Sequence, residues 1–141
     1  MRVGIIVIGA LVVASCFVST TVAETRVDKA VRLSKLSLSA MECSILATDK
    51  ADAQRLAKIG LASGKQYFDA VAKLSEEEEE IAGKDIPATW RGVTGISPDF
   101  VLGRVWEKME IIVRESLGDD KSNWAHEKAE KYADKNCMSI R

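Results

Sequence analysis

The chain has 141 residues and is close to electroneutral, with 20 lysines and arginines against 21 aspartates and glutamates. This balance leaves no basic face of the kind that non-specific nucleic-acid binding requires, so that class of partner is excluded. Three cysteines are also too few for a small scaffold held together by several disulfides.

The N-terminus has the three-part pattern of a secretory signal peptide. Met1 and Arg2 form a short positive start, residues 3–18 are apolar and uncharged, and small residues precede a cleavage position after Ala23. The apolar run is shorter than the roughly 20 residues that a membrane-spanning helix needs. We therefore predict a signal peptide over residues 1–23 and one exported domain over residues 24–141; an N-terminal anchor that is not cleaved is the alternative.

A second processing route is open within the same segment. Residues 13–16 resemble the bacterial lipobox, in which the cysteine is lipidated and becomes the first residue of the mature protein. The apolar run continues past Cys16, which is unusual for that motif. A cysteine in an apolar segment also behaves simply as a small hydrophobic residue, so lipidation at Cys16 is an alternative rather than the main prediction.

The other two cysteines, Cys43 and Cys137, lie near opposite ends of the predicted domain. In an oxidising compartment such a pair predicts a disulfide. The competing interpretation is a nucleophilic cysteine activated by His126, the one histidine of the chain. Nothing else in the sequence supports that chemistry, so we predict the Cys43–Cys137 bond and a structural role for His126.

Apolar residues recur at three- and four-residue steps through most of the domain, which is typical of amphipathic helices. The pattern predicts long helices over residues 26–48, 51–74, 97–117 and 123–136, and a short acidic helix that begins after Ser75. Alternating strand patterns are weak. The predicted fold class is all-α: a small bundle of about four helices, plus the short acidic helix, closed by one disulfide.

Clear signals mark the ends of the third long helix. Ser97 is placed as its N-cap, followed by Pro98 and Asp99 in the first turn, and Gly118 is placed as its C-terminal cap. The residues expected to face the core in the last two long helices include Phe100, Ile112, Trp124, Ala125, Ala129, Tyr132 and Ala133.

Small residues form a patch on the second helix, at Gly60, Ser63 and Gly64. Glycine in a helix interior costs up to about 1 kcal/mol, a cost that is tolerable where another helix crosses closely. We interpret the patch as a packing notch. The alternative is a ligand cavity between helices that is also lined by Tyr67, Trp106 and Met109.

Residues 76–80 are five consecutive glutamates directly after Ser75. Ser75 and Glu78 fit a capping box, and carboxylates suit the positive end of a helix. Calcium binding is disfavoured because consecutive helical carboxylates point around the axis rather than converging. We predict a solvated helix start, with Glu76, Glu77 and Glu78 as possible contacts for a basic partner, and no metal or other cofactor.

The segment over residues 83–97 is rich in glycine and is predicted to be a loop. It contains Trp90 and Arg91 side by side, and these are the residue types found most often at binding hot spots. We take this pair as the candidate partner-binding site. The alternative is that Trp90 packs back onto the helices.

The run over residues 97–104, placed between an early cysteine and Asn136 with Cys137, resembles small secreted helical proteins of enteric bacteria and their phages. The resemblance implies the bacterial periplasm, and it carries no known activity or functional residues. Size, export signal and disulfide are also similar to helical immunity proteins that protect bacteria against secreted amidases, although no motif matches residue by residue.

Three classes of function follow from these observations. The first is a periplasmic interaction protein, such as an inhibitor, immunity or exclusion factor that binds another envelope protein. The second is a carrier of a small apolar ligand. The third is an enzyme, which would need Asp99, Arg104, Glu107 and Glu110 to converge. We predict the first class and no catalytic residues, because these charged groups fit an ordinary exposed helix face.

Overall fold

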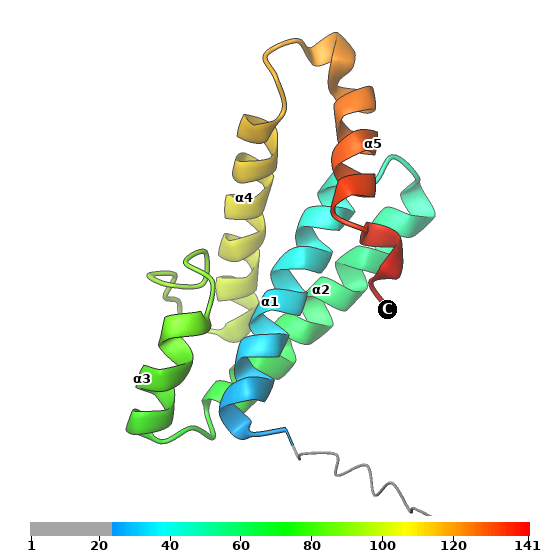
Figure 1. Ribbon diagram of the computed structural model, residues 1–141. Coiled ribbons are helices and arrows are strands. Elements are labelled where there is room, and N and C mark those ends of the chain that lie inside the picture. The colour runs from blue at the N-terminus through cyan, green and yellow to red at the C-terminus, as the bar shows by residue number, and fades with distance from the viewer. Residues whose placement is uncertain (1–23) are drawn as a thin grey trace, which may run out of the picture.

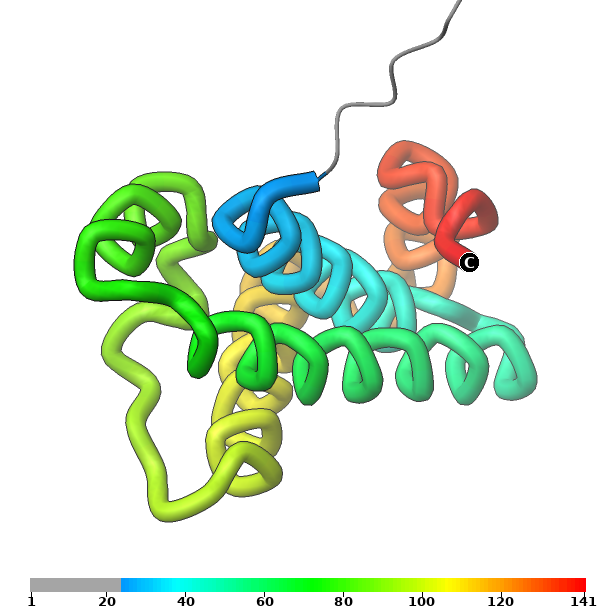
Figure 2. The backbone as a smooth tube through the Cα atoms, turned by 90° about the horizontal axis from the view of Figure 1, so that it is seen from below, coloured from blue at the N-terminus to red at the C-terminus, as the bar shows by residue number. Residues whose placement is uncertain are grey.

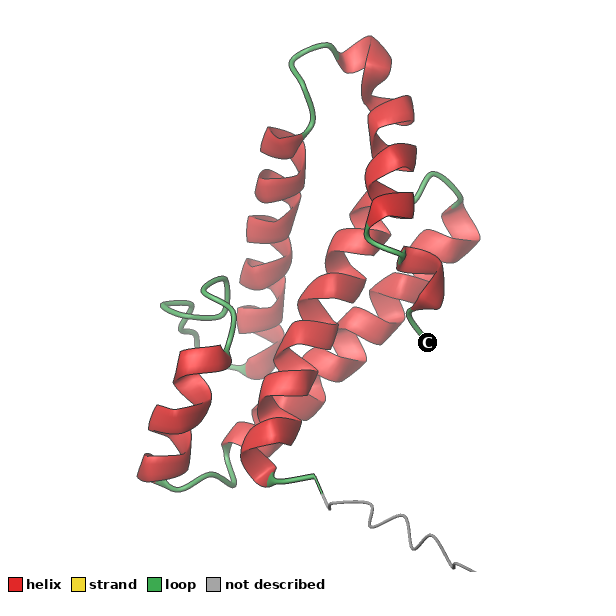
Figure 3. Ribbon diagram, in the orientation of Figure 1, coloured by secondary structure: helices red, strands yellow, loops and turns green. Residues whose placement is uncertain are grey.

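The computed structural model describes residues 24–141, and the predicted leader over residues 1–23 and Cys16 lie outside this part of the chain. Every regular element of residues 24–141 is helical (Figure 3). The predicted all-α class and the Cys43–Cys137 disulfide are confirmed. Within the same residues, no helix combines the length and the apolar character that crossing a bilayer would need.

The helices form a bundle around one long hairpin. Their bounds are α1 Arg26–Leu46, α2 Lys50–Val71, α3 Glu76–Asp85, α4 Pro98–Ser116 and α5 Trp124–Asp134, with short 3₁₀ turns η1 Lys121–Asn123 and η2 Cys137–Ser139. In Figure 1, α1 and α2 run side by side in opposite directions, α4 runs along α1, and α5 returns toward the middle of the hairpin. Figure 2 shows α3 and α5 on opposite sides of α1.

A side-chain cap fixes the start of each of the first four α-helices. In every case the N-cap oxygen accepts a hydrogen bond from the backbone N–H three residues later, which satisfies a donor that the helix itself leaves free. The caps are Thr25, Asp49, Ser75 and Ser97. The predictions for Ser75 and Ser97 are therefore confirmed.

Helices α1 and α2 approach each other so closely that their backbones are in contact. The Ser37 hydroxyl donates to the Gly60 carbonyl at 2.7 Å, and the Ser44 hydroxyl donates to the Ala53 carbonyl at 2.7 Å. A Cβ atom at Gly60 would lie 3.1 Å from the Met41 nitrogen. Gly60 of α2 therefore allows the two helices to pack closely, as the interpretation of this patch as a packing notch predicts. The serines of α1 supply the polar contacts between the helices.

The C-terminal segment is tied to this hairpin by covalent and polar contacts. The disulfide joins Cys43 of α1 to Cys137 of η2, with both side chains buried. The Tyr132 hydroxyl donates to Asp52, and Arg55 bonds both Asp52 and the Ile140 carbonyl. The hydrogen bond from Tyr132, followed by that from Arg55, holds the pKa of the Asp52 carboxyl below its usual value. This network is structural: each group in it joins α2 to the end of the chain.

Several expected inward residues are exposed, and these expectations were wrong. Phe100 and Ile112 of α4 remain 49 % and 43 % exposed, because α4 packs on α1 and α2 through a narrower stripe. The alanines Ala125, Ala129 and Ala133 of α5 are exposed. Helix α5 contacts the rest of the bundle mainly along α1, so only a narrow edge of it is covered.

Two element boundaries also differ from the predictions. Helix α4 ends at Ser116, and its C-cap is Leu117 in an extended conformation rather than a left-handed Gly118. The Gly118 N–H instead donates to Glu127 at 2.7 Å. Helix α3 continues through Gly83 to Asp85, so the loop before α4 begins at Ile86.

Candidate protein-binding surface

Trp90 packs back onto the helices, as the alternative interpretation of this residue held, and it is therefore not a surface anchor. It is 6 % exposed, and its indole N–H donates to the Ser34 carbonyl at 3.0 Å. Its ring centroid lies 4.7 Å from that of Tyr67 and 5.7 Å from that of Phe68. Desolvation in this cluster raises the pKa of the Tyr67 hydroxyl, with Glu79 adding to the effect. The predicted pair is split: Trp90 anchors the loop, and Arg91 remains on the surface.

The loop after Trp90 extends from the bundle before it joins α4. Gly92 has a φ of +73°, a conformation that favours glycine, and this turns the chain outward directly after Arg91. At the other end, Asp99 forms an ion pair with Lys65 of α2 at 2.9 Å. This ion pair is largely exposed and contributes little. The closer contacts of the segment are made by Val93, which packs against the core, and by Gly95, against which the Phe100 ring lies.

Ile96 stands at the exposed part of this loop and was overlooked in the sequence analysis. It directly precedes the N-cap Ser97, a position from which an apolar residue often packs against the residue four places into the helix, here Val101. In the structure Ile96 is 97 % exposed, whereas Val101 is buried. The side chain of Ile96 therefore buries almost no surface in the folded domain and adds little to its stability. An apolar residue immediately before a predicted N-cap is the sequence signal that would have drawn attention to it.

Helix α3 presents the acidic run to solvent. Glu76, Glu77, Glu79 and Glu80 are exposed, as is Ile81. Glu78 is engaged in the capping box: its carboxylate accepts from the Ser75 N–H at 2.9 Å. Glu78 also forms the single ion pair that residues 24–141 provide for this run, with Arg26 at 3.6 Å. Four of the five carboxylates are therefore free of compensating charge within this part of the chain.

The exposed loop begins beside the acidic helix and then runs away from it to the start of α4 (Figure 2). In both Figure 1 and Figure 2 the helix and the loop are on the side away from α5. We call this region the α3–loop surface; it consists of Glu76, Glu77, Glu79, Glu80, Ile81, Arg91 and Ile96. It combines negative charge with two exposed isoleucines, and Arg91 adds a donor with planar geometry.

The charged residues considered for catalysis do not converge. Asp99 pairs with Lys65, while Arg104 and Glu107 lie 3.8 Å apart on the outer face of α4. Glu110 accepts a hydrogen bond from the Trp106 indole at 2.9 Å. His126 contacts Glu130 at 3.3 Å on exposed α5. Each group has a local partner, and the arrangement offers no shared position for a reacting atom.

The space proposed for an apolar ligand is filled by side chains. A Cβ atom at Gly64 would meet Leu102 at 2.3 Å and Trp90 at 3.4 Å, and one at Gly60 would meet Met41 at 2.9 Å. Met109 is buried in the same core cluster. Among residues 24–141, no group of three or more histidine, cysteine or acidic side chains is placed to hold a metal ion.

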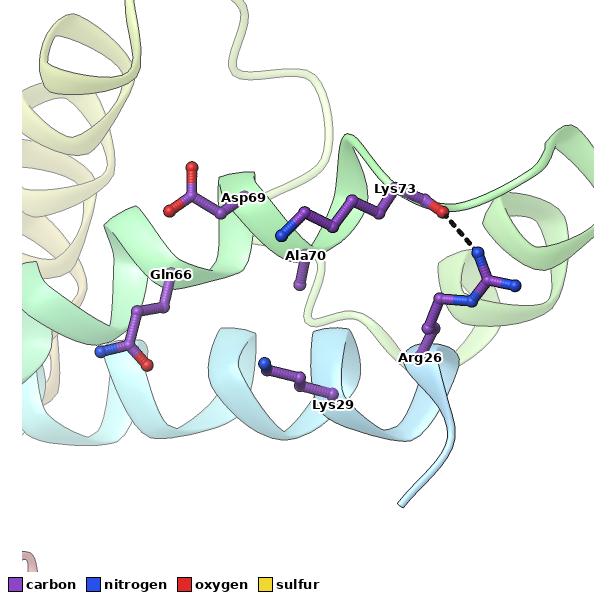
Figure 4. Close-up of a pocket in the computed structure, with 6 residues that line it drawn as sticks. All are labelled: Arg26, Lys29, Gln66, Asp69, Ala70 and Lys73. Carbon is purple, nitrogen blue, oxygen red and sulfur yellow. Dashed lines mark hydrogen bonds between the residues drawn. The ribbon is translucent and has the colours of Figure 1, made fainter. Parts of the chain in front are cut away.

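An open groove of about 280 Å³ lies between the first turns of α1 and the last turns of α2 (Figure 4). Its lining residues are Arg26, Lys29, Gln66, Asp69, Ala70 and Lys73. Arg26 donates to the Lys73 carbonyl at 3.1 Å, which occupies part of its polar capacity. The lysine side chains flank Ala70, and Asp69 lies among them, so the groove carries both signs of charge and selects no particular ligand.

The chain matches no family model, no curated protein and no solved structure.

Proposed function

We propose that this is an exported protein of the bacterial periplasm that binds another envelope protein, as an inhibitor, immunity or exclusion factor. The signal-peptide pattern of residues 1–23 and the buried disulfide support export, because such bonds persist in oxidising compartments. The binding site is the α3–loop surface.

The observation that carries this proposal is the exposure of Ile96. Its side chain is almost fully in water on a loop that Trp90 anchors at one end and that Val93 and Gly95 join to the helices. Burial of an isoleucine side chain is worth about 1.5–3 kcal/mol, and folding leaves this gain unused. A partner with an apolar pocket would realise it, and the pre-ordered loop reduces the entropy that binding must otherwise cost.

The charge of α3 defines the chemistry of the partner. Four exposed glutamates without ion pairs in residues 24–141 complement a basic protein surface. Such complementarity accelerates association, and salt weakens it, because the Debye length is about 8 Å at physiological ionic strength. We therefore propose a basic envelope protein as the partner.

The test compares variants that leave the core intact. One variant replaces the exposed glutamates of α3 by glutamine, and another carries Ile96→Ser. A matched control removes the same charge elsewhere, through Glu115→Gln, Asp119→Asn, Glu130→Gln and Asp134→Asn, all exposed positions. A partner captured from an envelope extract by the unaltered domain is purified, and its Kd is measured with each variant.

We expect both surface variants to weaken binding at least about tenfold, which corresponds to 1.4 kcal/mol, and the control to bind normally. The association rate of the unaltered domain is expected to fall as salt rises. Equal loss in the control and in the α3 variant, or unchanged binding by Ile96→Ser, would reject the α3–loop surface as the site. Circular dichroism verifies that each variant keeps its helices.

A further inference from the structure

The outer face of α4 carries a second unexplained surface. The buried residues of α4 lie on one side of the helix: Val101, Leu102, Val105, Met109 and Val113. At 100° per residue, the opposite side carries Phe100, Arg104, Glu107 and Ile111, which we call the α4 stripe. Phe100 is 49 % exposed and Ile111 is 47 % exposed. Ile111 therefore faces away from the core, whereas the Phe100 ring, although half exposed, lies against Gly95 of the loop before α4, where a Cβ atom would meet it at 2.3 Å.

The spacing along the α4 stripe is that of a helix–helix seam. Its members follow one another at steps of four, three and four residues, the repeat by which two helices pack along each other. The apolar members stand at the two ends and the charged members stand between them. The stripe thus has the pattern of a helix-packing face, although no helix of residues 24–141 covers it.

The order of residues in the α4 stripe is self-complementary. Phe100 and Ile111 are equally distant from the midpoint between Val105 and Trp106, and so are Arg104 and Glu107. Two antiparallel copies related by a two-fold axis at that midpoint would place each Phe100 against the partner's Ile111. The same operation would place each Arg104 against the partner's Glu107. An isologous interface requires this kind of matching.

Gly103 adds an independent observation beside the stripe. A Cβ atom at Gly103 would meet nothing within 4 Å, unlike those at Gly60 and Gly64. Glycine inside a helix costs about 1 kcal/mol relative to alanine, and packing within this domain does not require it here. In the antiparallel pairing, Gly103 lies level with Lys108 of the second copy but on the other flank of the stripe, and the missing side chain leaves its own flank of α4 open to a second helix.

We infer that a second copy of this chain docks antiparallel along α4, forming a two-fold dimer. Within one chain, Arg104 and Glu107 are 3.8 Å apart and largely exposed, an arrangement that contributes little. In the dimer each gains a partner across the interface and is shielded by the apolar ends. Because the stripe spans about 16 Å, the contact is small and reversible, and its population rises with concentration. None of its residues belongs to the α3–loop surface.

Charge reversal at Arg104 and Glu107 tests the dimer directly. A loss of helix stability alone would not restore association when the two variants are mixed. Arg104→Glu places a carboxylate against Glu107 of the second copy twice, and Glu107→Arg places two guanidinium groups against each other twice. Each single variant is expected to be monomeric, with a dimer Kd at least about tenfold weaker, or 1.4 kcal/mol. Mixed together, the two variants present opposite charges at both pairs and are expected to form a heterodimer.

Sedimentation equilibrium of residues 24–141 with the disulfide intact measures these masses. The unaltered chain and the double variant Arg104→Glu/Glu107→Arg are expected to dimerise, and Glu130→Arg on α5 serves as the control that changes charge elsewhere. Both single variants lose the same intrachain ion pair, so that loss cannot explain association in the mixture. A monomeric unaltered chain at about 1 mM, where even a −4.1 kcal/mol association is half populated, would overturn the proposal. So would a mixture that remains monomeric.

Discussion

Trp90→Ala is expected to lower the free energy of unfolding by about 3–5 kcal/mol, the range for truncation of a buried tryptophan. The change removes the ring that packs between Tyr67 and Phe68 and also removes the donor that reaches the Ser34 carbonyl. The neighbouring Arg91→Ala is exposed and is expected to change stability by less than about 0.5 kcal/mol. Urea unfolding, followed by circular dichroism, measures both values.

A third variant separates packing from hydrogen bonding. Trp90→Phe keeps an aromatic ring in the cluster but removes the indole N–H, so we expect an intermediate loss of stability. If Trp90→Ala instead retained full stability and abolished partner binding, Trp90 would be a surface anchor after all. The loop over residues 91–97 would then have to adopt a different arrangement from the one described.

Loss of the disulfide is the second large effect. The double variant Cys43→Ser/Cys137→Ser is expected to lose about 4 kcal/mol of stability, because the bond joins residues 94 positions apart and restricts the unfolded chain. The α1–α2 hairpin keeps its serine and glycine contacts, so the loss should begin at α5 and η2. Hydrogen exchange is expected to accelerate there first.

The control for this prediction is the unaltered protein with and without reductant. Reduction should reproduce the destabilisation of the double variant, and it should leave the double variant itself unchanged. Equal thermal midpoints for the oxidised and reduced protein would contradict the role assigned to the bond.

The starts of helices α3 and α4 could be predicted from the sequence, because each is set by capping residues that are neighbours in the chain. Ser75 with Glu78, and Ser97 followed by Pro98, mark helix starts that the structure confirms. The cysteine pair was predictable because two cysteines in one domain that is predicted to be exported have few alternatives. The burial of Ser34 and Ser37 was not predictable in this way, because it depends on the close approach of α2 at Gly60.

The faces of individual helices were harder to predict where tertiary packing decides them. Alanine fits both exposed and buried positions, so the small side chains of α5 did not indicate how little of that helix is covered. Phe100 belongs to an apolar pattern, yet α4 presents it to solvent together with Ile111. The most hydrophobic residues of a helix need not all face the same core.

The candidate site was only partly predictable for the same reason. The acidic run of α3 is visible in the sequence, and its exposure follows from its charge. Trp90 and Arg91 are adjacent in the chain but differ in burial, because both lie in a tight turn closed by the Pro87 and Ala88 carbonyls, in which neighbouring side chains point in different directions. The exposure of Ile96 was not predictable, because an apolar residue before an N-cap commonly packs against the residue four places into the helix.

The proposed binding of an envelope protein depends on delivery of the domain to an oxidising compartment, and intact mass spectrometry tests this delivery most directly. The full chain, tagged at its C-terminus, is expressed in a bacterium and recovered with free thiols blocked. The account predicts a protein that begins at Glu24 and gains two hydrogens on reduction; a start at an acylated Cys16 would keep export but place the domain at a membrane face. An intact chain that still begins at Met1 and carries free thiols at Cys43 and Cys137 would contradict the account.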